Sequence, residues 1–187
     1  MIVNVITKNP GKLASIKAAF SKFGIKVNQI EKGFFEIQAD SSLEIAENVA
    51  LQALRELNAP VIREDHSLFI NSLGIPGPYT SFMEKKMPVE KLLEILETQE
   101  DRSGYFEIAT VYLEPSGLAK RYVCKIPVFF EKEVKVSDPR GGWNGIIRLA
   151  DEKRTFTEYP EEERLHIWGK NCLALAEFLA NREKKEV

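Results

Sequence analysis

The most constraining feature of this sequence is the change, near its N-terminus, from an apolar run to a short polar loop and then to a helical pattern. The run Ile2–Ile6 is typical of a buried strand, and Ile16 and Phe20 recur at the spacing of one helix face. Between them, the segment Thr7–Lys12 contains a proline and a glycine. We therefore expect a strand, a tight loop and a helix that ends at Gly24.

This loop is suited to binding phosphate. The free N–H groups of a first helical turn point at whatever lies there, and the helix dipole favours an anion. Thr7, Asn9 and Lys12 add a hydroxyl, a carboxamide and an ammonium group, all of which donate hydrogen bonds to phosphate oxygens. The alternative is an ordinary strand-to-helix turn with a solvated lysine, and this segment alone leaves both interpretations open.

The rest of the pattern predicts an α/β fold, with a central mixed β-sheet flanked by helices. No repeat or long linker separates independent parts, so we expect one domain over residues 1–187. A long hairpin in the second half would form a second lobe and leave a cleft between the lobes. The expected strands are 25–29, 34–37, 60–62, 105–114, 118–130 and 146–149, and the expected later helices are 41–57, one beginning near Pro88, and 160–182.

Composition limits the classes of function. The 187 residues are 44% hydrophobic and 29% charged, as in a globular protein that dissolves in water. The net charge of −2 offers no general attraction for nucleic acid or for an anionic membrane. No segment has the pattern of a signal peptide or the length of a membrane span.

Cysteine and histidine limit the possible metals. Cys124 and Cys172 lie far apart without metal-binding spacing, which indicates a reducing compartment and a cytoplasmic protein. With only His66 and His166, a zinc site built from several histidines is excluded. A metal would have to be held by carboxylates, which favours Mg²⁺ or Mn²⁺.

Three carboxylates follow apolar runs, where we expect strands to end. Glu36 follows one run, and the pair Glu64 and Asp65 follows another. If these strands lie beside the first, the three acids come near the Thr7–Lys12 loop. Carboxylates beside a phosphate need a cation between them, and Mg²⁺ binds both. The alternative is that they are solvated residues at strand ends.

Taken together, these segments resemble the inosine triphosphate pyrophosphatase family, which hydrolyses non-standard purine nucleoside triphosphates to the monophosphate and pyrophosphate. The resemblance implies an elongated α/β fold of two lobes, an active site in the cleft between them, and a homodimer. The segments that carry it occur in the family's order and are Thr7–Lys12, Phe35–Ala39, Arg63–Phe69, Pro76–Tyr79, Glu100–Tyr105 and Thr155–Glu158.

The resemblance also implies roles for single residues. Thr7, Asn9 and Lys12 would bind the triphosphate. Glu36 and Asp65 would hold Mg²⁺, and Asp65 or Glu64 would orient the attacking water. Catalysis would then consist of positioning and charge neutralisation, with Lys12 opposing the negative charge that develops.

The segments expected to read the base depart from the family. In the glycine-rich loop, Asn144 stands where the family has an aspartate, beside Trp143, which could stack on a base or anchor the turn. Near the C-terminus, Trp168-Gly169-Lys170 stands where the family has serine, histidine and arginine, which leaves His166 or Lys170 as a candidate substrate contact. We therefore expect altered or relaxed base preference.

Two functions are compatible with these residues. The first is a Mg²⁺-dependent nucleoside triphosphate pyrophosphatase that clears ITP, XTP or dITP from the nucleotide pool. The second is a nucleotide-binding relative with little turnover, acting as a sensor or a regulatory subunit. Carboxylates at positions 36, 64 and 65 favour the enzyme. A nucleic-acid-binding module is disfavoured by the acidic net charge.

Overall fold

The computed structural model describes residues 1–138 and 142–184. These residues form a mixed α/β structure, and no helix among them is long and apolar enough to cross a membrane. The elements in chain order are β1 (Ile2–Ile6), α1 (Pro10–Ser21), β2 (Lys26–Ile30), α2 (Ser42–Leu57), β3 (Val61–Ile70), β4 (Ile75–Gly77), α3 (Thr80–Lys86), α4 (Val89–Glu97), β5 (Ser103–Leu113), β6 (Ala119–Phe130), β7 (Ile147–Leu149), α5 (Glu161–Trp168) and α6 (Lys170–Glu183).

The strands form a mixed sheet, as predicted. Its order is β2-β1-β3-β5-β6-β7, with β4 paired to β3 outside this path. Strand β1 is parallel to both β2 and β3, whereas β4 is antiparallel to β3 and β7 is antiparallel to β6. Parallel neighbours need crossover connections, and helices α1 and α2 lie in those connections.

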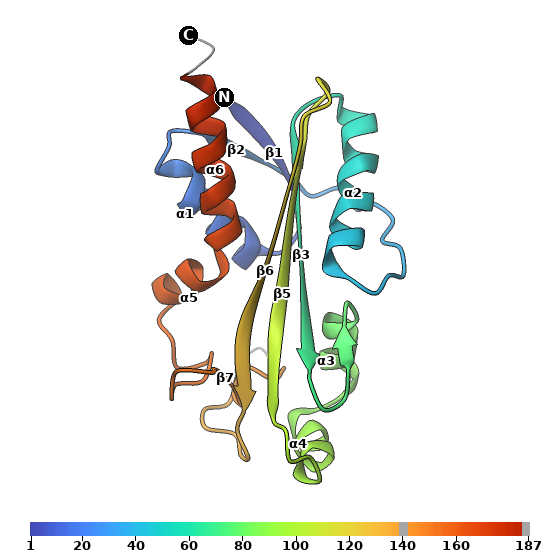
Figure 1. Cartoon of the computed structure of the whole chain (residues 1–187), viewed down its shortest axis with the longest axis vertical. Coiled ribbons are helices and arrows are strands. Elements are labelled where there is room, and N and C mark those ends of the chain that lie inside the picture. Colours follow the sequence, from blue (N-terminus) through green and yellow to red (C-terminus); the bar gives the residue numbers. More distant parts are fainter. Residues whose placement is uncertain (139–141, 185–187) are drawn as a thin grey trace. The chain divides into compact units, whose positions relative to one another are not determined.

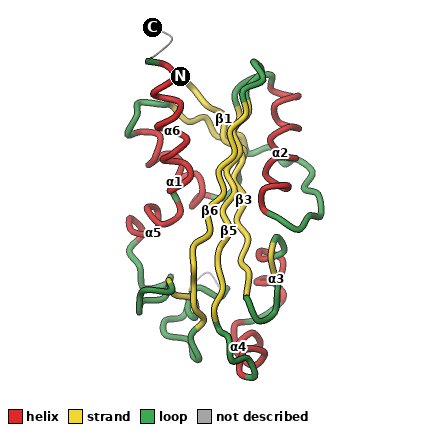
Figure 2. The backbone as a smooth tube through the Cα atoms, in the orientation of Figure 1, coloured by secondary structure: helices red, strands yellow, loops and turns green. Residues whose placement is uncertain are grey.

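The chain divides into two compact units. The first contains residues 1–65, residues 108–124 and the chain from Leu165 onward. The second contains the described parts of residues 66–107 and 125–164. In the first unit, α1 and α6 cover one face of the sheet and α2 covers the other (Figure 1). The tube in Figure 2 shows the same helix–sheet–helix layering by secondary structure.

Alternation along the strands assigns side chains to these two faces. Val3 and Val5 of β1 pack with α1 and α6, while Ile6 packs with α2. In β3, Ile62 belongs to the first cluster and Val61 to the second. Because successive residues of a strand point to opposite faces, the residues that follow Ile62 continue this alternation.

Most expected elements are confirmed, including the helix capped by Ser41 and the long hairpin. The strand expected at 34–37 was wrong, because this segment is irregular. The Gln52 side chain replaces a strand partner there: its Oε1 accepts the Phe35 N–H at 3.2 Å and its Nε2 donates to the Phe35 carbonyl at 2.7 Å.

Two further expectations need correction. Strand β3 does not stop at Glu64 and Asp65 but continues to Ile70, where it pairs with β4. The single helix expected over 160–182 is two helices, α5 and α6, separated at Gly169. A Cβ atom at Gly169 would lie 2.9 Å from the Leu165 carbonyl oxygen, so the chain turns there with almost no room for a side chain. Strand β4 and helix α3 were not predicted.

Arg102 joins the elements of the second unit. Its guanidinium is buried and donates to the carbonyl oxygens of Phe130 at 2.9 Å, Leu96 at 2.6 Å and Glu131 at 2.5 Å. Leu96 lies at the end of α4, and Phe130 ends β6. Burial lowers the pKa of Arg102, and the Glu131 carboxylate opposes that shift. One side chain therefore satisfies carbonyl groups of two elements.

We expect Arg102→Met to destabilise the protein by about 3 kcal/mol or more, because each buried carbonyl left without a donor costs about 1–3 kcal/mol. The measurement is the free energy of unfolding from urea titration. The matched control is Arg121→Met, which removes an exposed ion pair to Glu47 and should cost less than about 1 kcal/mol. Equal losses in the two variants would contradict a structural role for Arg102.

Candidate functional site

The Thr7–Lys12 loop is shaped by its own side chains. Asn9 caps α1: its Oδ1 accepts the N–H groups of Gly11 at 2.9 Å and Lys12 at 3.2 Å. The Thr7 hydroxyl accepts the Asn9 N–H at 3.1 Å, and Pro10 begins the helix. The loop conformation is therefore held by side-chain acceptors that bind backbone N–H groups in the first turn.

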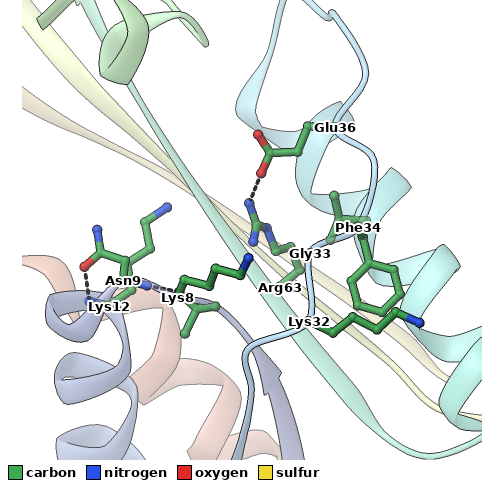
Figure 3. A pocket seen from close by; sticks show the side chains of 10 residues that line it. Lys8, Asn9, Lys12, Lys32, Gly33, Phe34, Glu36 and Arg63 are labelled. Atoms are coloured by element: carbon green, nitrogen blue, oxygen red, sulfur yellow. Dashed lines mark hydrogen bonds and ion pairs between the residues drawn. The ribbon is translucent and has the colours of Figure 1, made fainter. Parts of the chain in front are cut away.

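A cavity of about 290 Å³ lies against this loop in the first unit. Four of its lining side chains are cationic and only one is a carboxylate, although the whole chain has a net charge of −2. Such a cavity favours an anion. Figure 3 shows the residues that line it, which are Thr7, Lys8, Asn9, Lys12, Lys32, Gly33, Phe34, Glu36, Val49 and Arg63.

Lys12 connects the loop to strand β3. It is partly buried, and its Nζ donates to the Glu64 carbonyl oxygen at 3.1 Å. Burial lowers the pKa of this ammonium group, and the nearby charges of Asp65 and Glu64 oppose the shift. A cation that has lost much of its hydration is well placed to attract a phosphate oxygen.

Arg63 lies between two of the predicted carboxylates. Its Nη2 is 2.5 Å from Glu36 Oε1 and 4.0 Å from Asp65 Oδ1 (Figure 3 shows the first pair). Its Nη1 donates to the carbonyl oxygen of Ile6, the last residue of β1, at 3.1 Å. The guanidinium therefore bridges the end of β1, strand β3 and the irregular segment before α2.

Glu64 and Asp65 are adjacent in sequence but lie on opposite faces of the sheet. Arg63 and Asp65 share the face of Val61, and Glu64 shares the face of Ile62. The Glu64 carboxylate is buried and accepts hydrogen bonds from Thr110 Oγ1 at 3.2 Å and Cys172 Sγ at 3.0 Å. Its contacts are those of a residue held inside the α1/α6 layer.

Buried neighbours also change the chemistry of Cys172. Burial raises the pKa of this thiol well above its usual value, and the charge of Glu64 raises it further. The thiol therefore stays protonated and donates its hydrogen bond to Glu64.

The residues predicted to read the base do not line this cavity. Lys170 is exposed at the start of α6 and is near enough to Cys124 to oppose the rise in that thiol's pKa, which burial causes. In the second unit, Trp143 is buried and its indole N–H donates to the Met87 carbonyl at 3.0 Å. The Asn144 side chain donates to Asp138 at 2.7 Å.

The structure therefore brings four predicted residues to one cavity: Thr7, Asn9, Lys12 and Glu36. Asp65 borders it through Arg63 and Lys12. The sequence left two roles open for Trp143, and its contacts are those of a residue that anchors the turn. Stacking of its ring on a base stays a prediction. Of the predicted glycine-rich loop, Arg140 and Gly141 lie outside the described residues.

Sequence reasoning missed three cations of the cavity: Lys8, Lys32 and Arg63. Lys8 lies inside the predicted loop, and a Cβ atom on Gly33 would come within 3.5 Å of its Nζ. Arg63 directly precedes the acidic pair, so a basic residue beside two acids was the available signal. Lys32 carries no such signal, and it pairs with Glu56 at 2.5 Å.

Comparison with known proteins places the chain in a family. The model of the Ham1 family matches residues 3–179. A protein of Methanopyrus kandleri named dITP/XTP pyrophosphatase is 34% identical over 175 residues, which cover 89% of each chain. A protein of the same name from Methanosarcina mazei is 40% identical over 111 residues, but that match covers 59% of this chain and 60% of the relative.

Solved structures show the same fold. The Ham1 protein of Staphylococcus aureus has a TM-score of 0.80 with this chain at 21% identity, and the match covers 97% of this chain and all of that one. A HAM1 protein from Coxiella burnetii has a TM-score of 0.77 at 22% identity, with 99% of both chains covered. The fold, the family model and the relative from Methanopyrus kandleri agree, and the resemblance predicted from the motifs is confirmed: this chain belongs to the Ham1 family.

Proposed function

We propose that this chain hydrolyses nucleoside triphosphates to the monophosphate and pyrophosphate, with non-standard purine nucleotides such as dITP, XTP and ITP as substrates. Relatives that it matches are named dITP/XTP pyrophosphatase. The observation that carries the proposal is the cationic cavity at the Thr7–Lys12 loop, bordered by the carboxylates of Glu36 and Asp65. It combines groups that bind phosphate with groups that bind a cation.

The cations would bind the triphosphate chain. Lys8 and Lys12 flank the start of α1, and Arg63 lies in the same cavity. Ammonium groups attract phosphate as point charges, while a guanidinium can donate two parallel hydrogen bonds. Asn9 and Thr7 would act mainly by fixing the loop on which the two lysines lie. Lys12 keeps the role predicted from the sequence, whereas Thr7 and Asn9, predicted to bind the triphosphate, would act mainly through the loop, and Lys8 and Arg63 are added.

The acidic residues fit a divalent cation. A guanidinium already lies between Glu36 and Asp65, so this position holds positive charge in the structure. Their ligand atoms are carboxylate oxygens, which suit Mg²⁺ and also Mn²⁺. When bound, such an ion supplies charge neutralisation of the phosphates and a more acidic water.

The chain's own residues would position the reaction. Asp65 lies on the same sheet face as Arg63 and close to Lys12, so it is the better placed of the two adjacent acids to orient a water and take its proton. The Glu64 side chain, buried against Thr110 and Cys172, would instead support strand β3, and the Glu64 carbonyl oxygen accepts a hydrogen bond from Lys12. Lys12 would stabilise negative charge as it develops on the phosphate.

Selection of the base should be weak. The amide of Asn144 is held by Asp138, Trp143 is buried, and Lys170 has a flexible ammonium group rather than a planar donor pair. Contact of these three residues with the base, as predicted from the sequence, remains part of this proposal. The difference in turnover between purine analogues would then be smaller here than in an enzyme whose site hydrogen-bonds one base edge.

Other parts of the proposal concern the whole protein. We propose that residues 1–187 act as one catalytic domain, because the family match includes segments of both compact units. A homodimer and a cytoplasmic location are also proposed, as the sequence predicted.

The second candidate function is a nucleotide-binding protein with little turnover. The ion pair of Arg63 with Glu36 favours it, because that pair occupies a carboxylate proposed to bind the metal.

We expect Lys12→Ala to weaken binding of a nucleoside triphosphate by about 10- to 100-fold, because a charge-assisted hydrogen bond is worth about 1.5–3 kcal/mol. The measurement is the Kd for a non-hydrolysable dITP analogue by calorimetry. Lys17→Ala removes an exposed lysine from the same helix and is the control. An unchanged Kd in Lys12→Ala would place the phosphate site elsewhere.

We expect Asp65→Asn to lower kcat for pyrophosphate release from dITP by about 10²- to 10⁴-fold, since the amide cannot accept a proton from water. Nucleotide binding should stay measurable, which separates a lost catalytic group from a lost fold. Asp151→Asn changes an exposed acid in the second unit and serves as the control. Full turnover in Asp65→Asn would rule out the role assigned to this carboxylate.

A further inference from the structure

We propose that Arg63 exchanges partners during substrate binding, from the carboxylates of Glu36 and Asp65 to the phosphate chain. This inference rests on the proposed function. Without nucleotide, the guanidinium neutralises the two acids that would hold the cation. With nucleotide, it binds phosphate oxygens and leaves those acids to the cation. Arg63 would thus couple binding of the metal to binding of the triphosphate.

The position of Arg63 allows both sets of partners. Its side chain lines the same cavity as Lys8 and Lys12, so phosphate bound there comes within its reach. Its Nη1 is held by the Ile6 carbonyl at 3.1 Å, at the point where β1 ends. This bond fixes one side of the guanidinium and leaves the other side to change partners.

The bond to Glu36 is the one that can be exchanged. The Glu36 side chain is 56% exposed and lies in an irregular segment, whereas the Arg63 side chain is only 14% exposed. Ion pairs with an exposed partner are weak, because water competes for the charge. Glu36 can therefore leave Arg63 at little cost, while Arg63 stays in place on β3.

One donor of Arg63 is unused. Its Nε is buried and has no hydrogen-bond partner among the described residues. The Nε and Nη2 hydrogens point from the same edge of the guanidinium, and this edge can form two parallel bonds to phosphate. Once Glu36 has left, phosphate at that edge would accept hydrogen bonds from both Nε and Nη2.

Electrostatics makes the exchange depend on both ligands. A divalent cation on Glu36 and Asp65 would repel a guanidinium between the same two carboxylates. Phosphate oxygens give the guanidinium an alternative partner of higher charge. Metal should therefore strengthen phosphate binding, and phosphate should strengthen metal binding by the same factor.

The test uses Arg63→Met and two ligands measured separately. With Mn²⁺ alone, followed by electron paramagnetic resonance, the affinity should rise by about 5- to 20-fold, because the competing cation is gone. With inorganic tripolyphosphate alone, followed by calorimetry, the affinity should fall by about 10- to 100-fold, as for loss of charge-assisted bonds. A purely structural role would not move the two affinities in opposite directions.

Two further variants make the test specific. Arg121→Met removes another arginine–glutamate pair of the first unit, outside the cavity, and should change neither affinity. Arg63→Lys keeps the charge but not the planar edge, so it should weaken tripolyphosphate binding with a smaller gain in Mn²⁺ affinity.

The inference is overturned if Arg63→Met leaves the Mn²⁺ affinity unchanged or lowers it, or if tripolyphosphate binds as tightly as before. Pyrophosphate release from dITP by the unchanged protein is assayed separately. If both affinities shift as expected but no pyrophosphate is released, the partner exchange stands and the proposed enzymatic function fails.

Discussion

The proposed site depends on a difference between two neighbouring strands: β1 ends early, whereas β3 continues past that end. β1 stops at Ile6, and the chain turns through the capped loop into α1. β3 runs on from Val61 to Ile70, past the residues that pair with β1, so Arg63 and Asp65 lie on the part of β3 beside the end of β1. Arg63 donates to the Ile6 carbonyl that this ending leaves available. The phosphate loop and the carboxylates meet for that reason.

Local signals account for what the sequence predicted well. The apolar spacing of α1 and the Ser41 cap of α2 involve neighbours within a few residues, so they can be read from the chain itself. The long hairpin of β5 and β6 shows a period of two over many residues. Thr7, Asn9, Lys12 and Glu36 were assigned to one site by motif and order, and they line one cavity.

Tertiary contacts account for what the sequence could not predict. Phe34–Ile37 has a strand's composition, but Gln52 on α2 takes the backbone bonds of Phe35 and prevents a strand. Glu64 looked equivalent to Asp65, yet alternation along β3 turns it toward Cys172. Arg63 opens one of the family-like segments but had no predicted role, because its importance depends on an ion pair with Glu36, 27 positions away in the chain.

The most direct test of the account is pyrophosphate release from a panel of nucleoside triphosphates, with and without Mg²⁺. The panel holds inosine, deoxyinosine, xanthosine, guanosine, adenosine and pyrimidine triphosphates. We expect metal-dependent release from the non-standard purines, with inosine and adenosine triphosphates differing by less than about 10³-fold in kcat/KM, because few contacts read the base. No release from any member by the folded protein would contradict the account and leave a nucleotide-binding protein without turnover.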